Sequence, residues 1–228
     1  MTEPNKSRVQ KLAQQSFTRN DPTGWFEELY SRASGDESAI PWANLTISPN
    51  LANWIEQLDV QGQSKTALVV GCGLGDDAEA LAGLGFKVTG FDISPTAINW
   101  CQRRFPDSQV NYLVDDLLQP SQINQSQFDF ILESYTLQSL PAQVRPQAIK
   151  TISQLLAPQG TLLVICRGRD AQEPAATIPF PLTREELTYF EELGLKQVKF
   201  EDEIYQKNSL VRYFRIEYKL EVAKNQSK

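Results

Sequence analysis

The sequence contains no histidine in its 228 residues, and this absence excludes several kinds of chemistry. Histidine general bases, Ser-His and Cys-His nucleophile pairs and histidine metal sites are ruled out. Cysteine is scarce, since the chain has only Cys72, Cys101 and Cys166. An odd number of widely spaced cysteines indicates a reducing compartment and no disulfide framework. Any catalysis must therefore use carboxylates, tyrosine, lysine, cysteine or serine, or must need no base.

Basic residues are also few, with 22 against 28 acidic residues and a net charge of −6. No basic run is longer than a pair of residues. Because nucleic acids and anionic membranes bind basic faces, neither is an expected partner. No apolar run approaches the ~20 residues that span a membrane, and the N-terminal sequence lacks the apolar stretch of a secretory signal. We expect a cytoplasmic protein that acts on a small molecule.

Segments with strand and helix patterns alternate from residue 66 onward. Apolar runs predict strands at 66–70, 87–91, 110–114, 128–132 and 161–166. Amphipathic segments and their caps predict helices at 22–32, 48–58, 76–84, 95–104, 142–156 and 183–192. In the last of these, Thr183 and Glu186 predict a capping box. The polar residues 1–20 are expected to be loosely ordered, and the alternating segments 196–204 and 210–220 predict a hairpin. This order predicts an α/β fold with a doubly wound, mostly parallel sheet of seven strands and an antiparallel C-terminal hairpin strand.

One stretch, ALVVGCGLGDDAEALAGLGFKVTGFDIS at residues 67–94, places three glycines directly after a strand. Glycine there permits a tight turn and lets the backbone approach a ligand closely. In a doubly wound sheet, ligands bind beyond the carboxyl ends of the strands, where the strand order reverses. The residues expected at that crevice are Gly71, Asp92, Asp116 and Glu133. The sequence therefore predicts a ligand that contacts a glycine loop and several carboxylates.

The spacing of this loop argues against a dinucleotide cofactor. The dinucleotide fingerprint requires a third glycine at position 76, where the chain has Asp76. Asp76 and Asp77 would also repel a pyrophosphate at the helix N-terminus, and no G-K-[ST] follows as in a phosphate-binding P-loop. S-adenosylmethionine suits these acids better, because it has a sulfonium and an amino group but no phosphate. In that interpretation Asp92 accepts both ribose hydroxyls, and Asp116 or its neighbour Asp115 accepts from the adenine amino group.

Five segments of the chain resemble the class I S-adenosylmethionine-dependent methyltransferases, and in particular their thiopurine and thiol/halide branch. They are GWFEELYSRASGDESAIPW, ALVVGCGLGDDAEALA, VTGFDISPTAI, FDFILESYTLQSLPAQVRPQAI and IPFPLTREEL, in this order within residues 24–187. The apolar Val69, where most class I enzymes have Asp or Glu, is similar to that branch. The resemblance implies a Rossmann-like fold in a single domain, 1–228, with an N-terminal helical lid segment (1–60) and a cofactor-binding core (61–228).

The resemblance also implies which residues bind S-adenosylmethionine. They are Trp42, Gly71, Gly73, Asp77, Asp92, Ile93, Asp116, Leu117 and Glu133. Trp42 would lie near the sulfonium, because a cation is attracted to an aromatic face. Trp25 is either a second residue of this kind or part of the core of the lid. Asp77 is also interpreted as an ordinary acid at a helix N-terminus. The product would be S-adenosylhomocysteine, and no metal is expected.

At the end of the fourth predicted strand, Glu133 and Tyr135 are the implied catalytic residues. Ser134 departs from the mammalian thiopurine enzymes, which have arginine at this position, so thiopurine substrates are not implied. Three arginines are each open to two interpretations, contact with the substrate or a structural or solvated position: Arg145, Arg167 and Arg169.

Methyl transfer from a sulfonium requires positioning and desolvation more than it requires a base. A chain without histidine is therefore suited to a soft nucleophile such as a thiol, selenol, halide or thiocyanate, which is already wholly or partly anionic. The predicted function is methyl transfer to such an acceptor by a monomeric enzyme. Two alternatives stay open: another small acceptor, such as a phenol, a carboxylate or a metalloid oxyanion, and a non-catalytic protein that binds S-adenosylmethionine.

Overall fold

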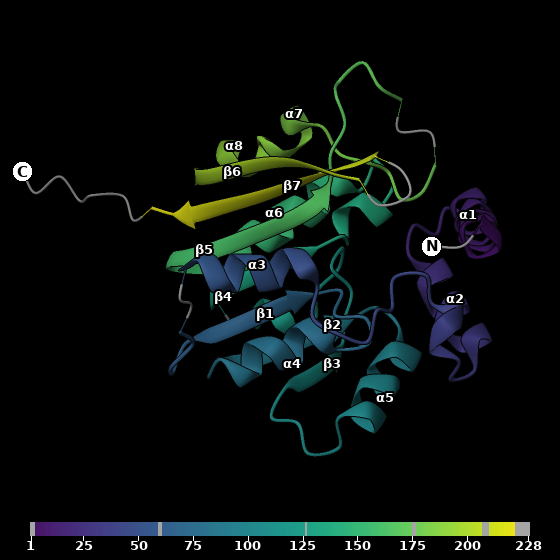
Figure 1. The fold of residues 1–228 in the computed structure, drawn as a ribbon, viewed down its shortest axis with the longest axis horizontal. Coiled ribbons are helices and arrows are strands. Elements are labelled where there is room, and N and C mark those ends of the chain that lie inside the picture. The colour runs from purple at the N-terminus through teal and green to yellow at the C-terminus, as the bar shows by residue number, and fades with distance from the viewer. Residues whose placement is uncertain (1–2, 59–60, 126, 175–176, 207–209, 222–228) are drawn as a thin grey trace, which may run out of the picture.

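The computed structural model describes residues 3–58, 61–125, 127–174, 177–206 and 210–221, and a single sheet forms its centre (Figure 1). The strands are β1 (Thr66–Val70), β2 (Lys87–Asp92), β3 (Asn111–Val114), β4 (Phe128–Ser134), β5 (Leu156–Arg167), β6 (Leu195–Gln206) and β7 (Leu210–Leu220). Their order is β3-β2-β1-β4-β5-β7-β6, with the first five parallel and β7 antiparallel to both of its neighbours. The predicted fold class is confirmed. The turn of the terminal hairpin, residues 207–209, lies outside the described residues.

Apart from α1, α7 and α8, the helices lie close to their predicted positions. They are α1 (Glu3–Thr18), α2 (Gly24–Ala33), α3 (Pro49–Leu58), α4 (Asp76–Gly83), α5 (Pro95–Arg104), α6 (Arg145–Leu155), α7 (Arg184–Leu187) and α8 (Tyr189–Glu192), with short 3-10 turns η1 (Glu37–Ala39), η2 (Ile123–Gln125) and η3 (Leu137–Ser139). The capping box of Thr183 and Glu186 is present, as predicted. The single helix predicted over 183–192 is wrong, because the segment divides at Thr188 into α7 and α8.

The prediction of a loosely ordered N-terminus is also wrong. Helix α1 is 16 residues long and packs against α2. Its buried side chains, Val9, Leu12, Ala13 and Ser16, recur at the spacing of one helix face. This stripe is narrow and its flanking residues are polar, so the segment has little helical signal on its own. The helix is stable because tertiary packing covers that stripe.

The sheet is covered on both faces, as its buried strands require. Alternate residues of β1 enter different cores: Ala67 and Val69 face α3 and α4, whereas Leu68 and Val70 face the other layer, with α6. We call these the α3 face and the α6 face. Figure 1 shows α1 and α2 beyond the carboxyl ends of the parallel strands, so these two helices overhang the edge of the sheet where ligands bind in this architecture.

Helices α1 and α2 and the residues that follow them, up to Trp42, are called the overhanging segment (3–42). A carboxylate of α2 fixes this segment to the rest of the protein. Glu27 accepts hydrogen bonds from Ser94 Oγ at 2.6 Å and from Thr96 Oγ1 at 2.6 Å, at the first turn of α5. Partial burial raises the pKa of Glu27, but the hydrogen bonds from Ser94 and Thr96 outweigh it and leave the pKa below its ordinary value. The acid is therefore ionised at neutral pH and holds α2 near the end of β2.

Candidate active site

The loop after β1 has a backbone shape that only glycine adopts freely. Gly71, Gly73 and Gly75 have φ of +60°, +56° and +92°. A Cβ on Gly71 would lie 2.5 Å from Thr136 Oγ1, and that hydroxyl is itself held by the carbonyl of Val70. The three glycines therefore let β1 turn sharply beside the segment that follows β4.

Asp92 ends β2 and points at this loop. Its carboxylate is buried and accepts from Gly73 N at 3.0 Å and from Ser94 N at 2.9 Å. Burial raises the pKa of Asp92 to about 6, against the opposing effect of these hydrogen bonds. Each oxygen keeps a lone pair beyond its backbone bond. The acid and the glycine loop thus form one unit, in which Asp92 orients the peptide plane of Gly73.

The structure separates the two acids that follow β3. Asp115 accepts hydrogen bonds from the backbone N–H groups of Ser121, Gln122 and Ile123, and so holds the connection to η2. Burial raises its pKa, but these bonds outweigh it and lower the pKa overall. Asp116 is half-buried and accepts from Leu118 N at 2.8 Å. Asp115 is therefore committed to the loop, whereas the Asp116 carboxylate accepts one backbone hydrogen bond among the described residues.

The acids at the start of α4 have protein partners. Asp76 forms a two-pronged pair with Arg104, at 2.8 and 2.9 Å, so its charge is balanced within the fold. Asp77 accepts from Ser48 N at 2.7 Å and thereby ties the start of α3 to the glycine loop. Burial raises the pKa of Asp77 to about 6. The structure thus gives Asp77 a structural bond in addition to its place beside the crevice.

Aromatic residues of the overhanging segment rest on the loop. Trp42 Nε1 donates to Tyr30 Oη at 3.0 Å, and the Trp42 ring meets the Trp25 ring edge-on at 6.0 Å between centroids. A Cβ on Gly73 would lie 3.2 Å from Tyr30 Oη and 3.9 Å from Trp42 Nε1. Trp25 is fully buried and stacks on Phe26, which makes it a core residue of this segment, whereas Trp42 is half-buried.

The end of β4 carries a buried acid and a constrained tyrosine. Glu133 has no exposed surface, and its Oε1 accepts from Thr136 N and Leu137 N, both at 2.8 Å. Burial raises the pKa of Glu133 to about 7. Tyr135 has φ of +64°, and its hydroxyl accepts from Asn50 Nδ2 at 2.8 Å. Burial raises the pKa of Tyr135 to about 12, so it stays protonated at neutral pH.

Buried polar atoms without a partner gather at this end of the sheet. Within the described ranges, four side-chain atoms are in this state: Trp25 Nε1, Ser48 Oγ, Glu133 Oε2 and Ser134 Oγ. Glu133 and Ser134 are the last two residues of β4, and Ser48 directly precedes α3. Buried polar groups are hydrogen-bonded in the great majority of cases, so these atoms are open to a partner from outside the described chain. A polar ligand at the carboxyl end of β4 would supply one.

Two of the three arginines singled out in the sequence are engaged by the protein. Arg145 pairs with Glu186 and donates to the Leu140 carbonyl. Arg169 pairs with the same Glu186 and donates to the Pro181 carbonyl at 2.8 Å. Both therefore fasten the segment after β5. Arg167 stands apart from this network.

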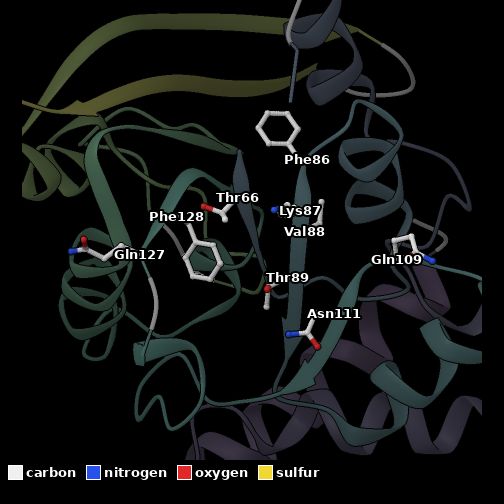
Figure 2. Close-up of a pocket in the computed structure, with 9 residues that line it drawn as sticks. All are labelled: Thr66, Phe86, Lys87, Val88, Thr89, Gln109, Asn111, Gln127 and Phe128. Carbon is white, nitrogen blue, oxygen red and sulfur yellow. The ribbon is translucent and has the colours of Figure 1, made fainter. Parts of the chain in front are cut away.

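A hollow of about 560 Å³ lies at the opposite end of the sheet (Figure 2). Its lining includes the first residues of four strands: Thr66, Lys87, Asn111 and Phe128. These are amino ends, and open α/β sheets bind their ligands beyond the carboxyl ends. We therefore place the candidate site at the glycine loop and the end of β4.

Residues 67–160 match the methyltransferase domain family. The chain is also similar to a probable thiol methyltransferase 2 of Arabidopsis thaliana, with 28% identity over 155 residues, 65% of this chain and 63% of that protein. Together with the sheet order and the loop after β1, these matches support a class I S-adenosylmethionine-dependent methyltransferase.

Two further similarities accompany this assignment. Thiocyanate methyltransferase 1 of Arabidopsis thaliana is 25% identical over 136 residues, 57% of each protein. The chain thus matches less than two thirds of the length of either plant relative. The fold is shared with a Burkholderia thailandensis 1,6-didemethyltoxoflavin-N1-methyltransferase with bound 1,6-didemethyltoxoflavin and S-adenosylhomocysteine. That structure has a TM-score of 0.66 and 16% identity, over 86% of this chain and 88% of the other.

Three residues of the candidate site were not predicted from the sequence: Asn50, Tyr30 and Thr136. Tyr30 and Thr136 lie in segments that carry the resemblance, but only the structure shows their contacts with Trp42 and Gly71. Asn50 and Tyr135 are 85 positions apart in the chain, and no local pattern links them. Across the described part of the chain, no helix is long and apolar enough to cross a membrane, and no three potential metal ligands gather.

The raised pKa of Glu133 predicts how stability depends on pH. The folded state binds this proton more tightly than the unfolded chain, where a glutamate carboxyl has an ordinary pKa of 4.5. Between about pH 4.5 and 7 the folded protein therefore holds the extra proton, and the free energy of unfolding falls as the pH rises through that range. Glu133→Gln removes this contribution. Relative to the wild type, the variant should gain at least about 1 kcal/mol between pH 5 and pH 8 in urea unfolding. An unchanged difference between the two proteins at both pH values contradicts the burial argument.

Proposed function

We propose that this protein transfers a methyl group from S-adenosylmethionine to a small soft nucleophile, namely a thiol, selenol, halide or thiocyanate, by in-line displacement. The acid–base groups at the end of β4 are the observation that supports this acceptor class. There a histidine-free chain offers a neutral tyrosine and one buried carboxyl, Tyr135 and Glu133, as its acid–base groups. Both plant relatives are named for acceptors of this class, a thiol and thiocyanate.

The residues of the crevice suit the donor. In this proposal the Gly71–Gly73 backbone faces the methionine part, Asp92 and Ile93 take the ribose, and Asp116 and Leu117 take the adenine. Trp42 closes the site from the overhanging segment, where its ring offers an electron-rich face to a cation. When bound, S-adenosylmethionine supplies a methyl group on a sulfonium, and it leaves as the neutral thioether S-adenosylhomocysteine.

The buried acids of the site also favour S-adenosylmethionine as the ligand. Asp77, Asp92 and Glu133 all have raised pKa values because burial penalises their ionised forms. A cation placed near such acids favours ionisation and is in turn attracted by the resulting carboxylates. A pyrophosphate would have the opposite effect. The set of acids thus favours a positively charged ligand over a dinucleotide.

The acceptor has to be a group that these residues can activate. A thiol with a pKa near ~8.5 is already ~3% thiolate at pH 7, and halide and thiocyanate carry no proton to remove. Tyr135 stays protonated, so it orients an acceptor as a hydrogen-bond donor while Asn50 holds its oxygen. Glu133 Oε2 has no partner within the described chain and is the oxygen able to accept the thiol proton. Positioning by the closed crevice then provides most of the acceleration, and well-oriented reactants gain ~7–11 kcal/mol.

Glu133→Gln separates proton transfer from positioning. With a thiol acceptor at pH 7 the variant should lose about 10- to 30-fold in kcat/KM, because only ~3% of the free thiol is ionised. The loss should vanish near pH 9.5, where the thiol ionises unaided. With thiocyanate, the matched acceptor without a proton, the rate should stay within about threefold of the wild type at every pH. An equal loss on both acceptors would make Glu133 a positioning residue and not a base.

An acceptor screen tests the proposed function. Purified protein with S-adenosylmethionine is offered a thiol, iodide, thiocyanate, a phenol, a carboxylate and tellurite, and methylated products are measured by mass spectrometry. The proposal predicts methylation of the thiol and the anions, with S-adenosylhomocysteine formed in equal amount. Methylation of only the phenol, the carboxylate or the oxyanion replaces the acceptor class. Tight S-adenosylhomocysteine binding without turnover on any acceptor would support a non-catalytic binding protein.

A further inference from the structure

A polar wall borders the candidate site on the α3 face. It consists of Asn50, Ser134, Tyr135, Arg167 and Tyr213. The Tyr135 ring packs edge-on against the Tyr213 ring, with 6.2 Å between centroids. Tyr213 lies directly opposite Arg167 in the β5–β7 ladder, and opposite residues of such a ladder share a face. Arg167 is therefore a neighbour of Tyr213, which in turn contacts Tyr135 at the end of β4.

The alternation of β5 places the Arg167 side chain on this same face. Ile165 belongs to the core under α3, whereas Cys166 belongs to the core under α6, so Arg167 returns to the α3 face. On the neighbouring strand, Arg215 reaches α3 and donates to the Asn50 carbonyl at 3.0 Å. Arg167 comes two residues after Ile165, the residue paired with Arg215, and it ends β5 at the carboxyl edge of the sheet.

The backbone of Arg167 is fixed on both sides, while its guanidinium has no partner among the described residues. Its N–H donates to the buried Gln138 Oε1 at 2.6 Å, and its carbonyl accepts from Leu182 N at 2.9 Å. Across all the ranges that the structure describes, 3–58 and 210–221 included, no hydrogen bond or ion pair reaches the guanidinium. Arg169, two residues later, pairs with Glu186 and donates to three carbonyls. The side chain of Arg167 is thus half-buried, anchored at its base and available at its tip.

Nearby carboxylates are already satisfied. Glu201 on β6 pairs with Arg215 and Lys199. Glu203, opposite Tyr213, accepts from the Tyr205 hydroxyl, and Glu217 accepts from Trp54 Nε1 at 3.3 Å. No carboxylate in the described chain therefore occupies the place of a partner for Arg167. A half-buried guanidinium with its fork free is the group that proteins use for two-pronged binding of a carboxylate.

We propose that Arg167 is a specificity-determining residue that binds a carboxylate of the acceptor, so that the preferred acceptor is a small mercaptocarboxylic acid. The inference rests on the proposed function for the thiol end of that molecule. Tyr135 orients the sulfur at the end of β4, and Arg167 holds the carboxylate on the neighbouring strand. A neutral thiol of equal size is then a poorer acceptor because the guanidinium gains no ion pair from it.

Two thiols that differ only in this charge test the proposal: mercaptoacetate and 2-mercaptoethanol. Binding of each is measured by calorimetry in the presence of S-adenosylhomocysteine, and methylation of each is measured separately. The wild type should bind mercaptoacetate at least about tenfold more tightly, with a lower KM and a similar kcat. Arg167→Met should remove this preference and leave 2-mercaptoethanol unaffected. Arg167→Lys, which keeps the charge without the fork, should retain part of the preference.

Arg103→Met is the matched control, because Arg103 is exposed at the end of α5 and its loss changes the net charge equally. This variant should keep the full preference. If Arg167→Met keeps it too, or if the wild type does not prefer mercaptoacetate, the role of Arg167 is overturned while methyl transfer stands. If mercaptoacetate binding depends on Arg167 but no thiol is methylated, the Arg167 site stands and the proposed function fails.

Discussion

Gly71→Ala should destabilise the protein by about 2–5 kcal/mol and reduce the affinity for S-adenosylhomocysteine by more than tenfold. Two costs add at this position. A residue with a Cβ pays roughly 1–2 kcal/mol for the left-handed φ of +60°. The added carbon would also lie 2.5 Å from Thr136 Oγ1, and relieving such a contact in a packed site costs about 1–3 kcal/mol. Thr136 cannot yield freely, because its hydroxyl is bonded to the Val70 carbonyl and its N–H to Glu133.

Two other glycines provide controls for this result. Gly83 ends α4 without a positive φ, and a Cβ there would have no atom within 4 Å, so Gly83→Ala should be neutral or stabilising by up to ~1 kcal/mol. Gly35 has φ of +89° in open space, so Gly35→Ala should show the conformational cost alone. Urea unfolding measures all three. If Gly71→Ala lowers the free energy of unfolding by no more than Gly35→Ala does, the inferred close approach of the loop to Thr136 is wrong.

Asp92→Asn should lower the affinity for S-adenosylhomocysteine by about 100-fold at pH 7.5. Hydrogen bonds to a charged group contribute about 1.5–3 kcal/mol, and in the proposed function the carboxylate accepts from the ribose hydroxyls. An asparagine also turns an NH₂ group toward one of the two backbone N–H donors, from Gly73 and Ser94, that Asp92 now accepts. The substitution therefore disturbs the position of the glycine loop and also weakens the proposed hydrogen bonds to the ribose. Calorimetric titration measures the loss.

The control for Asp92→Asn is Asp129→Asn. Asp129 also accepts a backbone hydrogen bond, from Thr66 N at 2.8 Å, but it lies at the amino end of the sheet. Its replacement should leave S-adenosylhomocysteine affinity within about twofold, well under 1 kcal/mol. Equal binding by Asp92→Asn and the wild type would remove the ribose role from Asp92. Because burial raises the pKa of Asp92 to about 6, the wild type should also bind more weakly at pH 5 than at pH 7.5.

The sequence predicted the elements whose boundaries are set locally. The apolar run at β1 and the Ser94-Pro95 start of α5 place those elements at the residues predicted. Where a boundary depends on a distant partner, the prediction fell short. Strand β5 begins at Leu156 instead of 161, because Leu156 pairs with Phe128 across an irregularity in register, although Pro158 and Gly160 indicate a turn. Helix α1 was missed for the same reason, since its buried stripe is defined by α2.

The candidate site was also only partly predictable from the sequence. Parallel strands must end at one edge, so the order of strands alone brings Gly71, Asp92, Asp116 and Glu133 to the same side of the sheet. Their partners were not predictable, because Asn50, Thr136 and Tyr213 reach the site through tertiary packing. The choice between Asp115 and Asp116 also needed the structure, since only the fold shows that Asp115 holds the η2 segment.

A calorimetric titration of the purified protein with S-adenosylhomocysteine, with NAD titrated in parallel, shows which ligand the crevice at the carboxyl ends of the strands binds. We expect a Kd in the micromolar range for S-adenosylhomocysteine and no binding of NAD, because the loop after β1 lacks the third glycine of a dinucleotide site. If NAD binds, or if neither ligand binds, this crevice is not a site for the methyl donor.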